Sequence, residues 1–94
     1  MDFEWSEAKR LWVLNERGID FIRVADSLFD GRPILTVPSV RAGEERFLSV
    51  LCIEGKFFAV IWMRRNTVVR IVTARRARDG EEKRYREIFG QTDR

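Results

Sequence analysis

The stretch from Val68 to Arg78 constrains the fold most, because a β-branched run passes directly into a cationic end with no acidic residue between them. Valine, isoleucine and threonine side chains pack well on the pleated surface of a sheet. The run is too short to span a membrane and is bounded by the turn-forming residues Asn66 and Asp79-Gly80. The sequence therefore predicts a buried strand that brings four arginines to one end of a sheet: Arg70, Arg75, Arg76 and Arg78.

Arginines at a strand end have two interpretations. They are often solvated or paired with acidic residues, but their planar donor groups also suit phosphate oxygens. The chain has 18 basic and 15 acidic residues and a net charge of only +3, yet six arginines and no acid lie between Met63 and Arg78. This asymmetry favours an anionic partner such as RNA, DNA or an acidic protein segment.

Composition limits the possible chemistry. The 94 residues, 45% of them hydrophobic, suit one globular domain over residues 1–94. The single cysteine, Cys52, allows no disulfide within the chain and suits a reducing cytoplasm, while the acidic start indicates no signal peptide. No segment is long enough for a transmembrane helix, so no membrane partner is expected. Without histidine, neither a metal site nor a cofactor is expected.

Two helices are expected after a short lead-in from Met1 to Trp5. The first begins with Ser6 as N-cap and ends at Gly18, and the second begins at Asp20 and ends at Asp30-Gly31. Helical spacing predicts that each helix turns an apolar stripe to the core. The stripes are Trp5, Ala8, Leu11, Trp12 and Leu14, then Phe21, Val24, Ala25, Leu28 and Phe29.

The middle of the chain predicts strands. Glu54-Gly55 is a hairpin turn signal, and apolar residues on both faces of the following segment indicate a central strand. A third helix is expected from Asp79, with Glu82 completing a capping box, to Gly90. The predicted fold is α+β, ordered ααββββα, with helices packed on a four-stranded antiparallel sheet. The expected strands are Ile34 to Val37 at an edge, Arg46 to Ile53, Lys56 to Met63 and the Val68 stretch.

The remaining residue types could act on RNA phosphodiesters. Attack by a 2′-hydroxyl needs a proton acceptor, cations that stabilise the transition state and a donor to the leaving oxygen, and preorganised arginines supply the electrostatic part. The proton acceptor would be Glu45, Glu81, Tyr85 or Lys9, each with a shifted pKa. The cluster considered for this chemistry is Lys9, Arg17, Glu45, Arg46, Arg64, Arg65, Arg70, Arg75, Arg76 and Tyr85.

Several segments of the chain, from residue 3 to about residue 86, resemble toxins of the BrnT family. The most specific is the stretch from Arg70 to Ala77, which is similar to the signature "RIISARxA" of that family. The resemblance implies a ribonuclease toxin of a bacterial type II toxin–antitoxin pair, with a RelE-like fold. It also implies a BrnA-like antitoxin that neutralises the toxin and through which the complex contacts operator DNA. The similar segments are Phe3-Glu4-Trp5-Ser6-x-x-Lys9, Gly18-Ile19-Asp20-Phe21, Phe29-Asp30, Gly43-Glu44-Glu45-Arg46 and the arginine-rich stretch with Glu81 and Tyr85.

The chain departs from this family at two positions. The family commonly has Lys-His-Gly where this chain has Glu16-Arg17-Gly18, and Val13 replaces a frequent asparagine. Arg17 can still bind phosphate, but its guanidinium stays protonated and is a poor proton shuttle. An alternative hypothesis is therefore a non-catalytic basic protein that binds the antitoxin or nucleic acid. Direct DNA recognition by this chain alone is weaker, because no recognition helix is evident.

The main hypothesis is a metal-independent endoribonuclease. Its catalytic candidates are Glu45, Arg46, Arg70, Arg75 and Tyr85. Its RNA-binding candidates are Lys9, Arg17, Arg64, Arg65 and Arg76. Structural alternatives remain for three of them: a salt bridge for Glu45, packing for Tyr85 and simple solvation for Lys9.

Overall fold

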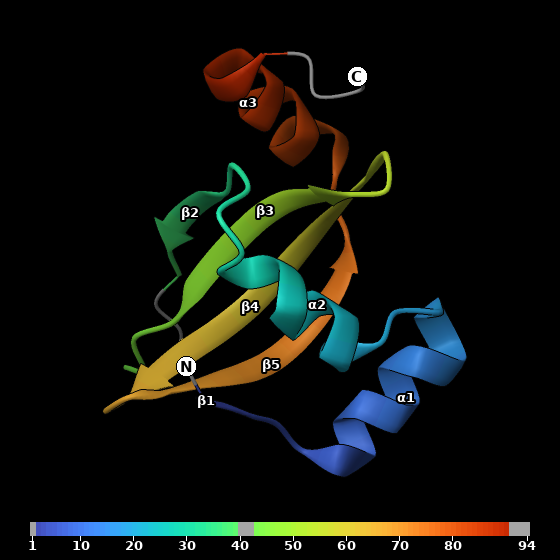
Figure 1. The fold of residues 1–94 in the computed structure, drawn as a ribbon, viewed down its shortest axis with the longest axis vertical. Helices are drawn as coiled ribbons and strands as arrows, with labels where there is room; N and C mark the ends of the chain where they lie inside the picture. The colour runs from blue at the N-terminus through green and yellow to red at the C-terminus, as the bar shows by residue number, and fades with distance from the viewer. Residues whose placement is uncertain (1, 40–42, 91–94) are drawn as a thin grey trace.

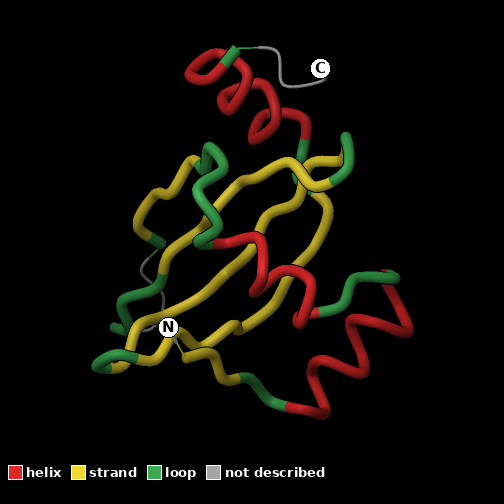
Figure 2. Tube along the Cα trace, viewed as in Figure 1, coloured by secondary structure: helices red, strands yellow, loops and turns green. Residues whose placement is uncertain are grey.

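The computed structural model describes residues 2–39 and 43–90, which form three helices and one five-stranded sheet (Figure 1 and Figure 2). The strands lie in the order β1-β5-β4-β3-β2. The predicted α+β class is therefore confirmed. The elements are β1 (Asp2–Glu4), α1 (Glu7–Arg17), α2 (Phe21–Leu28), β2 (Leu35–Pro38), β3 (Phe47–Ile53), β4 (Lys56–Arg65), β5 (Val68–Arg76) and α3 (Asp79–Phe89).

Strands β2 to β5 form the expected antiparallel meander, with β2 at an edge of the sheet. The β3–β4 turn has positive φ at both central residues, 51° at Glu54 and 78° at Gly55. Primed hairpin turns have this conformation, which matches the twist of the strands they join. The turn before β5 places Asn66 at a φ of 55°. Local turn chemistry thus sets the register of the three longest strands.

The expected four-stranded layout is wrong because the lead-in forms a fifth strand. Residues Asp2–Glu4 make β1, which pairs in parallel with the start of β5, Asp2 opposite Val68 and Glu4 opposite Arg70. Three residues are too few to show the alternation by which a strand is predicted from sequence. β1 forms because the folded sheet offers it an edge, which is a tertiary effect.

The two faces of the sheet are covered differently. Helices α1 and α2 cover one face, whereas α3 packs against one end of the other (Figure 1). Val50 and Leu51 are successive residues of β3, so they point to opposite faces; Val50 packs with Tyr85 of α3, and Leu51 lies in the larger core. That core includes Val13, Phe21, Val24, Leu28, Val60, Trp62, Val69, Ile71 and Ala74.

Helix α1 has the predicted caps, but its buried side differs from the predicted one. The Ser6 side chain accepts from the backbone N–H of Lys9, and Gly18 ends the helix in the left-handed region. However, Val13 is fully buried, while Leu11 and Trp12 are 45% and 48% exposed. The predicted core stripe is therefore wrong at these two residues and at Ala8, which is also exposed, whereas Trp5 and Leu14 are half-buried. The side of α1 that packs against the rest of the protein also carries arginines, so this side looks polar in the sequence.

The other two helices are closer to expectation. In α2 the predicted stripe is buried except for Phe29, which is 46% exposed just beyond the helix. Helix α3 ends at Gly90 as predicted, but its N-cap is Arg78, and the Glu81 carboxylate accepts from the Arg78 backbone N–H at 2.8 Å. The predicted Asp79–Glu82 capping box is therefore wrong by one residue. Of the apolar residues of α3, Tyr85 is buried, whereas Ile88 and Phe89 are 52% and 38% exposed.

Candidate functional site

The end of β5 brings two guanidinium groups to one strand edge. Arg17, the last residue of α1, donates from Nη1 to the carbonyl of Ala74 at 2.9 Å and to Thr73 Oγ1 at 3.3 Å. Arg75 donates from Nη1 to the carbonyl of Arg76 at 3.2 Å. The Ala74 and Arg76 carbonyls are two residues apart, so they point to the same edge with a spacing of about 7 Å. We define the β5 exit as Arg17, Thr73, Ala74, Arg75, Arg76 and Glu81.

Arg75 and Glu81 form a two-point ion pair at the β5 exit. Arg75 Nη1 lies 2.8 Å from Glu81 Oε1, and Nη2 lies 2.9 Å from Oε2. The two side chains are only 23% and 19% exposed. The hydrogen bonds from Arg75 lower the pKa of the Glu81 carboxyl against the opposing effect of burial, with a further contribution from the Arg78 N–H. Glu81 is therefore ionised at neutral pH, and the same pairing raises the pKa of Arg75.

A β-bulge directs Arg75 towards Glu81. Between Ile61 and Trp62 of β4 the register of β5 shifts, so that Val72 is an additional residue. Without this insertion, Arg75 would share the face of Ile71, which packs under α1 and α2. With it, Ala74 takes the buried position and Arg75 points to the face of α3. Bulges of this kind re-aim side chains next to functional sites.

Arg76 points to the other face of the sheet from Arg75. Its Nε donates to the carbonyl of Phe57 at 3.1 Å, and its guanidinium lies 5.5 Å from the centre of the Phe58 ring. Phe58 also lines a cavity of about 180 Å³ between the α1–α2 connection and the β3–β4 hairpin. Lys56 and Arg23 border this cavity, although Arg23 forms an ion pair with Glu54. The β5 exit is therefore basic on both faces of the sheet.

Half of the ten predicted site residues lie at the opposite end of the sheet. Arg70 is paired with Glu4 of β1 at 2.9 Å, roughly 15 Å along the strand from Arg75. The prediction that four arginines share one sheet end is thus wrong for Arg70, because the pairing with β1 was not foreseen. Arg46 is paired with Glu44 at 3.1 Å. The residues placed near this end are Glu45, Arg46, Arg64, Arg65 and Arg70.

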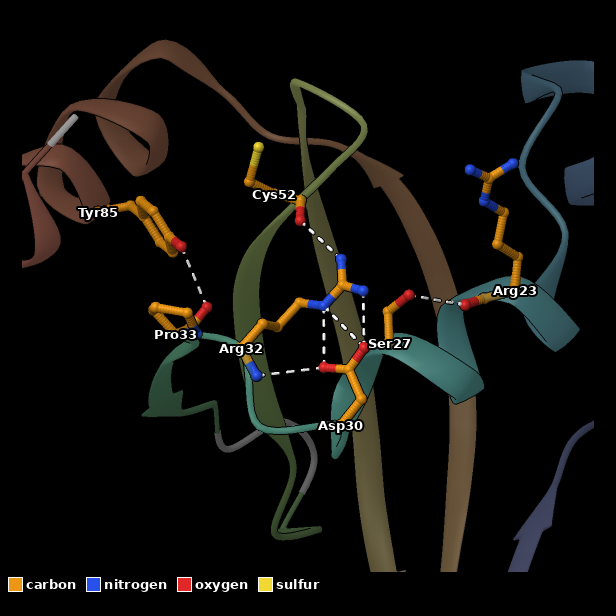
Figure 3. Close-up of polar contacts among 7 residues, drawn as sticks. All are labelled: Arg23, Ser27, Asp30, Arg32, Pro33, Cys52 and Tyr85. Carbon is orange, nitrogen blue, oxygen red and sulfur yellow. Dashed lines mark hydrogen bonds and ion pairs between the residues drawn. The ribbon is translucent and has the colours of Figure 1, made fainter. Parts of the chain in front are cut away.

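Tyr85 lies in a packing environment between α3 and the segment before β2 (Figure 3). It is 1% exposed, its hydroxyl donates to the carbonyl of Pro33 at 3.1 Å, and its ring packs edge-on against Phe57. Burial raises the pKa of the Tyr85 hydroxyl. In the same region, hydrogen bonds from Arg32 lower the pKa of Asp30 to about 2 (Figure 3). These contacts agree with the packing interpretation of Tyr85; its catalytic role stays a prediction.

Comparison with known families identifies the chain. Residues 5–81 match the model of a family described as ribonuclease toxin, BrnT, of type II toxin–antitoxin system. The chain belongs to the BrnT toxin family. This confirms the resemblance, while no curated protein matches the chain. Membership associates the chain with an antitoxin partner and an RNA target.

Within this BrnT-family structure, sequence reasoning recognised Glu81 only as a possible proton acceptor and missed its pairing with Arg75. An available signal was its position three residues after the N-cap of α3, where a carboxylate returns to the preceding backbone. In the described ranges, no group of three potential metal-ligating side chains comes together. The helices among these residues are too short or too polar to cross a lipid bilayer.

Proposed function

We propose that this BrnT-family chain is a metal-independent endoribonuclease of the bacterial cytoplasm, neutralised by a BrnA-like antitoxin, and that it cleaves RNA at the β5 exit. The observation that carries this proposal is the placement of Arg17 and Arg75 along one strand edge, next to the Glu81 carboxylate. Guanidinium groups that are fixed to two carbonyls about 7 Å apart on one strand edge suit a phosphodiester and the charge that develops on it during cleavage.

The reaction is attack of the ribose 2′-oxygen on phosphorus with departure of the 5′-oxygen. Both described hydrogen bonds of Arg17 use Nη1, so its remaining N–H donors can hold a phosphate oxygen. Of the carboxylate candidates, Glu81 lies at the β5 exit, whereas Glu45 precedes β3 near the opposite end. Glu81 is ionised and accepts the 2′-hydroxyl proton, while solvent protonates the leaving oxygen. Its lowered pKa makes it a weak base, so we expect slow cleavage.

A second candidate function is non-catalytic binding of the antitoxin or of nucleic acid. The observation that favours it is the two-point contact between Arg75 and Glu81, because an incoming phosphate must compete with a carboxylate already in place. Arg17, where the family commonly has histidine, adds a cation but no proton shuttle. On this account the β5 exit binds an anionic partner without cleaving it.

The experiment that separates the two functions is cleavage of end-labelled single-stranded RNA by the purified chain in EDTA. Cleavage in EDTA supports the nuclease, and cleavage that EDTA abolishes contradicts the metal-free mechanism. Arg17→His then tests the alternative, with Arg46→His at the opposite end as its matched control. The non-catalytic function is supported if the parent chain is inactive and Arg17→His is active. It is also supported if the parent chain is inactive but still binds the antitoxin.

A further inference from the structure

Trp12 is an exposed aromatic residue with two cations held against its ring. It is 48% exposed on α1, and Lys9 Nζ lies 4.9 Å from the ring centre. The guanidinium carbon of Arg17 lies 5.0 Å from the same ring. Arg17 also donates to the carbonyl of Ala74, so it connects Trp12 to the β5 exit. The indole and the two cations therefore form one surface beside the proposed cleavage site.

We propose that Trp12 is the stacking platform for one unpaired base of the RNA, an inference that rests on the proposed function. Single-stranded nucleic acids bind where cations follow the phosphates and aromatic rings receive the bases. Lys9 and Arg17 neutralise the phosphates on either side of the stacked base. Arg17 then contacts both the platform and the scissile region, so the base on Trp12 lies close to the cleaved bond.

The two cations favour RNA over a protein partner at this surface. An apolar protein segment that covered Trp12 would also remove water from Lys9 and Arg17, and burying unpaired charges is costly. An RNA strand brings its own phosphates, which compensate these charges. Leu11 is similarly exposed at 45%, but its aliphatic side chain has no π-face on which a base could stack.

The test is binding of a fluorescent single-stranded RNA whose 2′-hydroxyls are methylated, so that they cannot attack phosphorus, measured by anisotropy. We expect Trp12→Ala to raise Kd by about 5- to 150-fold and Trp12→Phe to retain most of the affinity. Ile22→Ala is the matched control, since Ile22 is 51% exposed on α2, and its Kd should stay within about twofold of the parent chain. The dependence of Kd on salt should be unchanged in Trp12→Ala, because the indole carries no charge.

Several results would overturn the inference. Unchanged RNA affinity in Trp12→Ala contradicts stacking, and if the parent chain still cleaves RNA, the proposed function survives. A reduced salt dependence means that Trp12 only positions the cations. Normal RNA binding with lost antitoxin binding assigns this surface to a protein partner. No RNA binding by the parent chain contradicts the proposed nuclease itself.

Discussion

The two ends of β5 carry the same residue type in different settings. Arg70 meets Glu4 through one nitrogen, with side chains 33% and 39% exposed, whereas Arg75 meets Glu81 through two nitrogens at 23% and 19%. Glu4 lies on a three-residue strand, while Glu81 also binds the N-cap of α3. How firmly each arginine is held therefore depends on how firmly the backbone around its carboxylate partner is held. The β5 exit is preorganised to a degree that the opposite end is not.

The largest expected effect on stability comes from truncating a buried side chain in the middle of β5, between its two ends. Ile71 is 1% exposed in the middle of β5, so Ile71→Ala should lower the free energy of unfolding by about 2–5 kcal/mol. Urea denaturation followed by tryptophan fluorescence measures this change. An unchanged denaturation midpoint would mean that packing in the middle of β5 does not stabilise the strand that carries both ends.

Glu81→Gln tests the exit pair directly. We expect a loss of about 1–2 kcal/mol near neutral pH, because hydrogen bonds to a partly buried carboxylate are lost. The folded state lowers the pKa of Glu81, so its contribution is present above the unfolded pKa of about 4.3 and is lost as the pH falls through the folded pKa. Thermal melts of the parent chain and of Glu81→Gln are measured between pH 7 and pH 3. The difference in stability between the two should disappear in acid. A stability difference between the two proteins that stays constant over this pH range would contradict the pairing of Glu81 with Arg75.

Tyr85→Phe separates packing from catalysis at the α3 end of the sheet. Loss of the hydroxyl contact to Pro33 should cost about 0.5–1.5 kcal/mol and leave the cleavage rate per folded molecule unchanged. Thermal melts and cleavage rates on the same preparation provide both values. A much lower rate with an unchanged melt would restore Tyr85 as a catalytic residue.

Arg70→Ala should have the smallest effect. An ion pair with a third or more of each side chain exposed contributes about 0–1 kcal/mol, so the change in unfolding free energy should stay within that range. Glu4→Ala is the matched control and should behave in the same way. A loss well above this range in either variant would show that the β1 end is as firmly organised as the β5 exit.

Local signals in the sequence predicted most of the fold. The caps at Ser6 and Asp20 and the Glu54-Gly55 turn depend on residues within a few positions of each other, and the structure contains all three. Strand β1 could not be predicted, because Asp2–Glu4 is extended only through pairing with β5. The buried face of α1 was misassigned because Arg17, on the side that meets β5, made that side look polar.

The candidate site was only partly predictable for the same reason. The sequence shows that arginines are concentrated after Met63, but their distribution over two sheet ends depends on strand pairing. The direction of Arg75 depends on the bulge at Val72, which alternation of side chains cannot reveal. Its pairing with Glu81 further depends on where α3 begins. Family resemblance predicted the function class without resolving this geometry.

The central claim is that RNA is cleaved at the β5 exit, and one measurement tests it most directly. Rates of RNA cleavage in EDTA are compared for the parent chain, Arg75→Ala and Arg70→Ala, each corrected for its folded fraction. The account predicts a loss of about 10²–10³-fold for Arg75→Ala, the cost of removing a group that stabilises the transition state, and a rate within about threefold of the parent for Arg70→Ala. Equal losses in both variants, or full activity in Arg75→Ala, would contradict it.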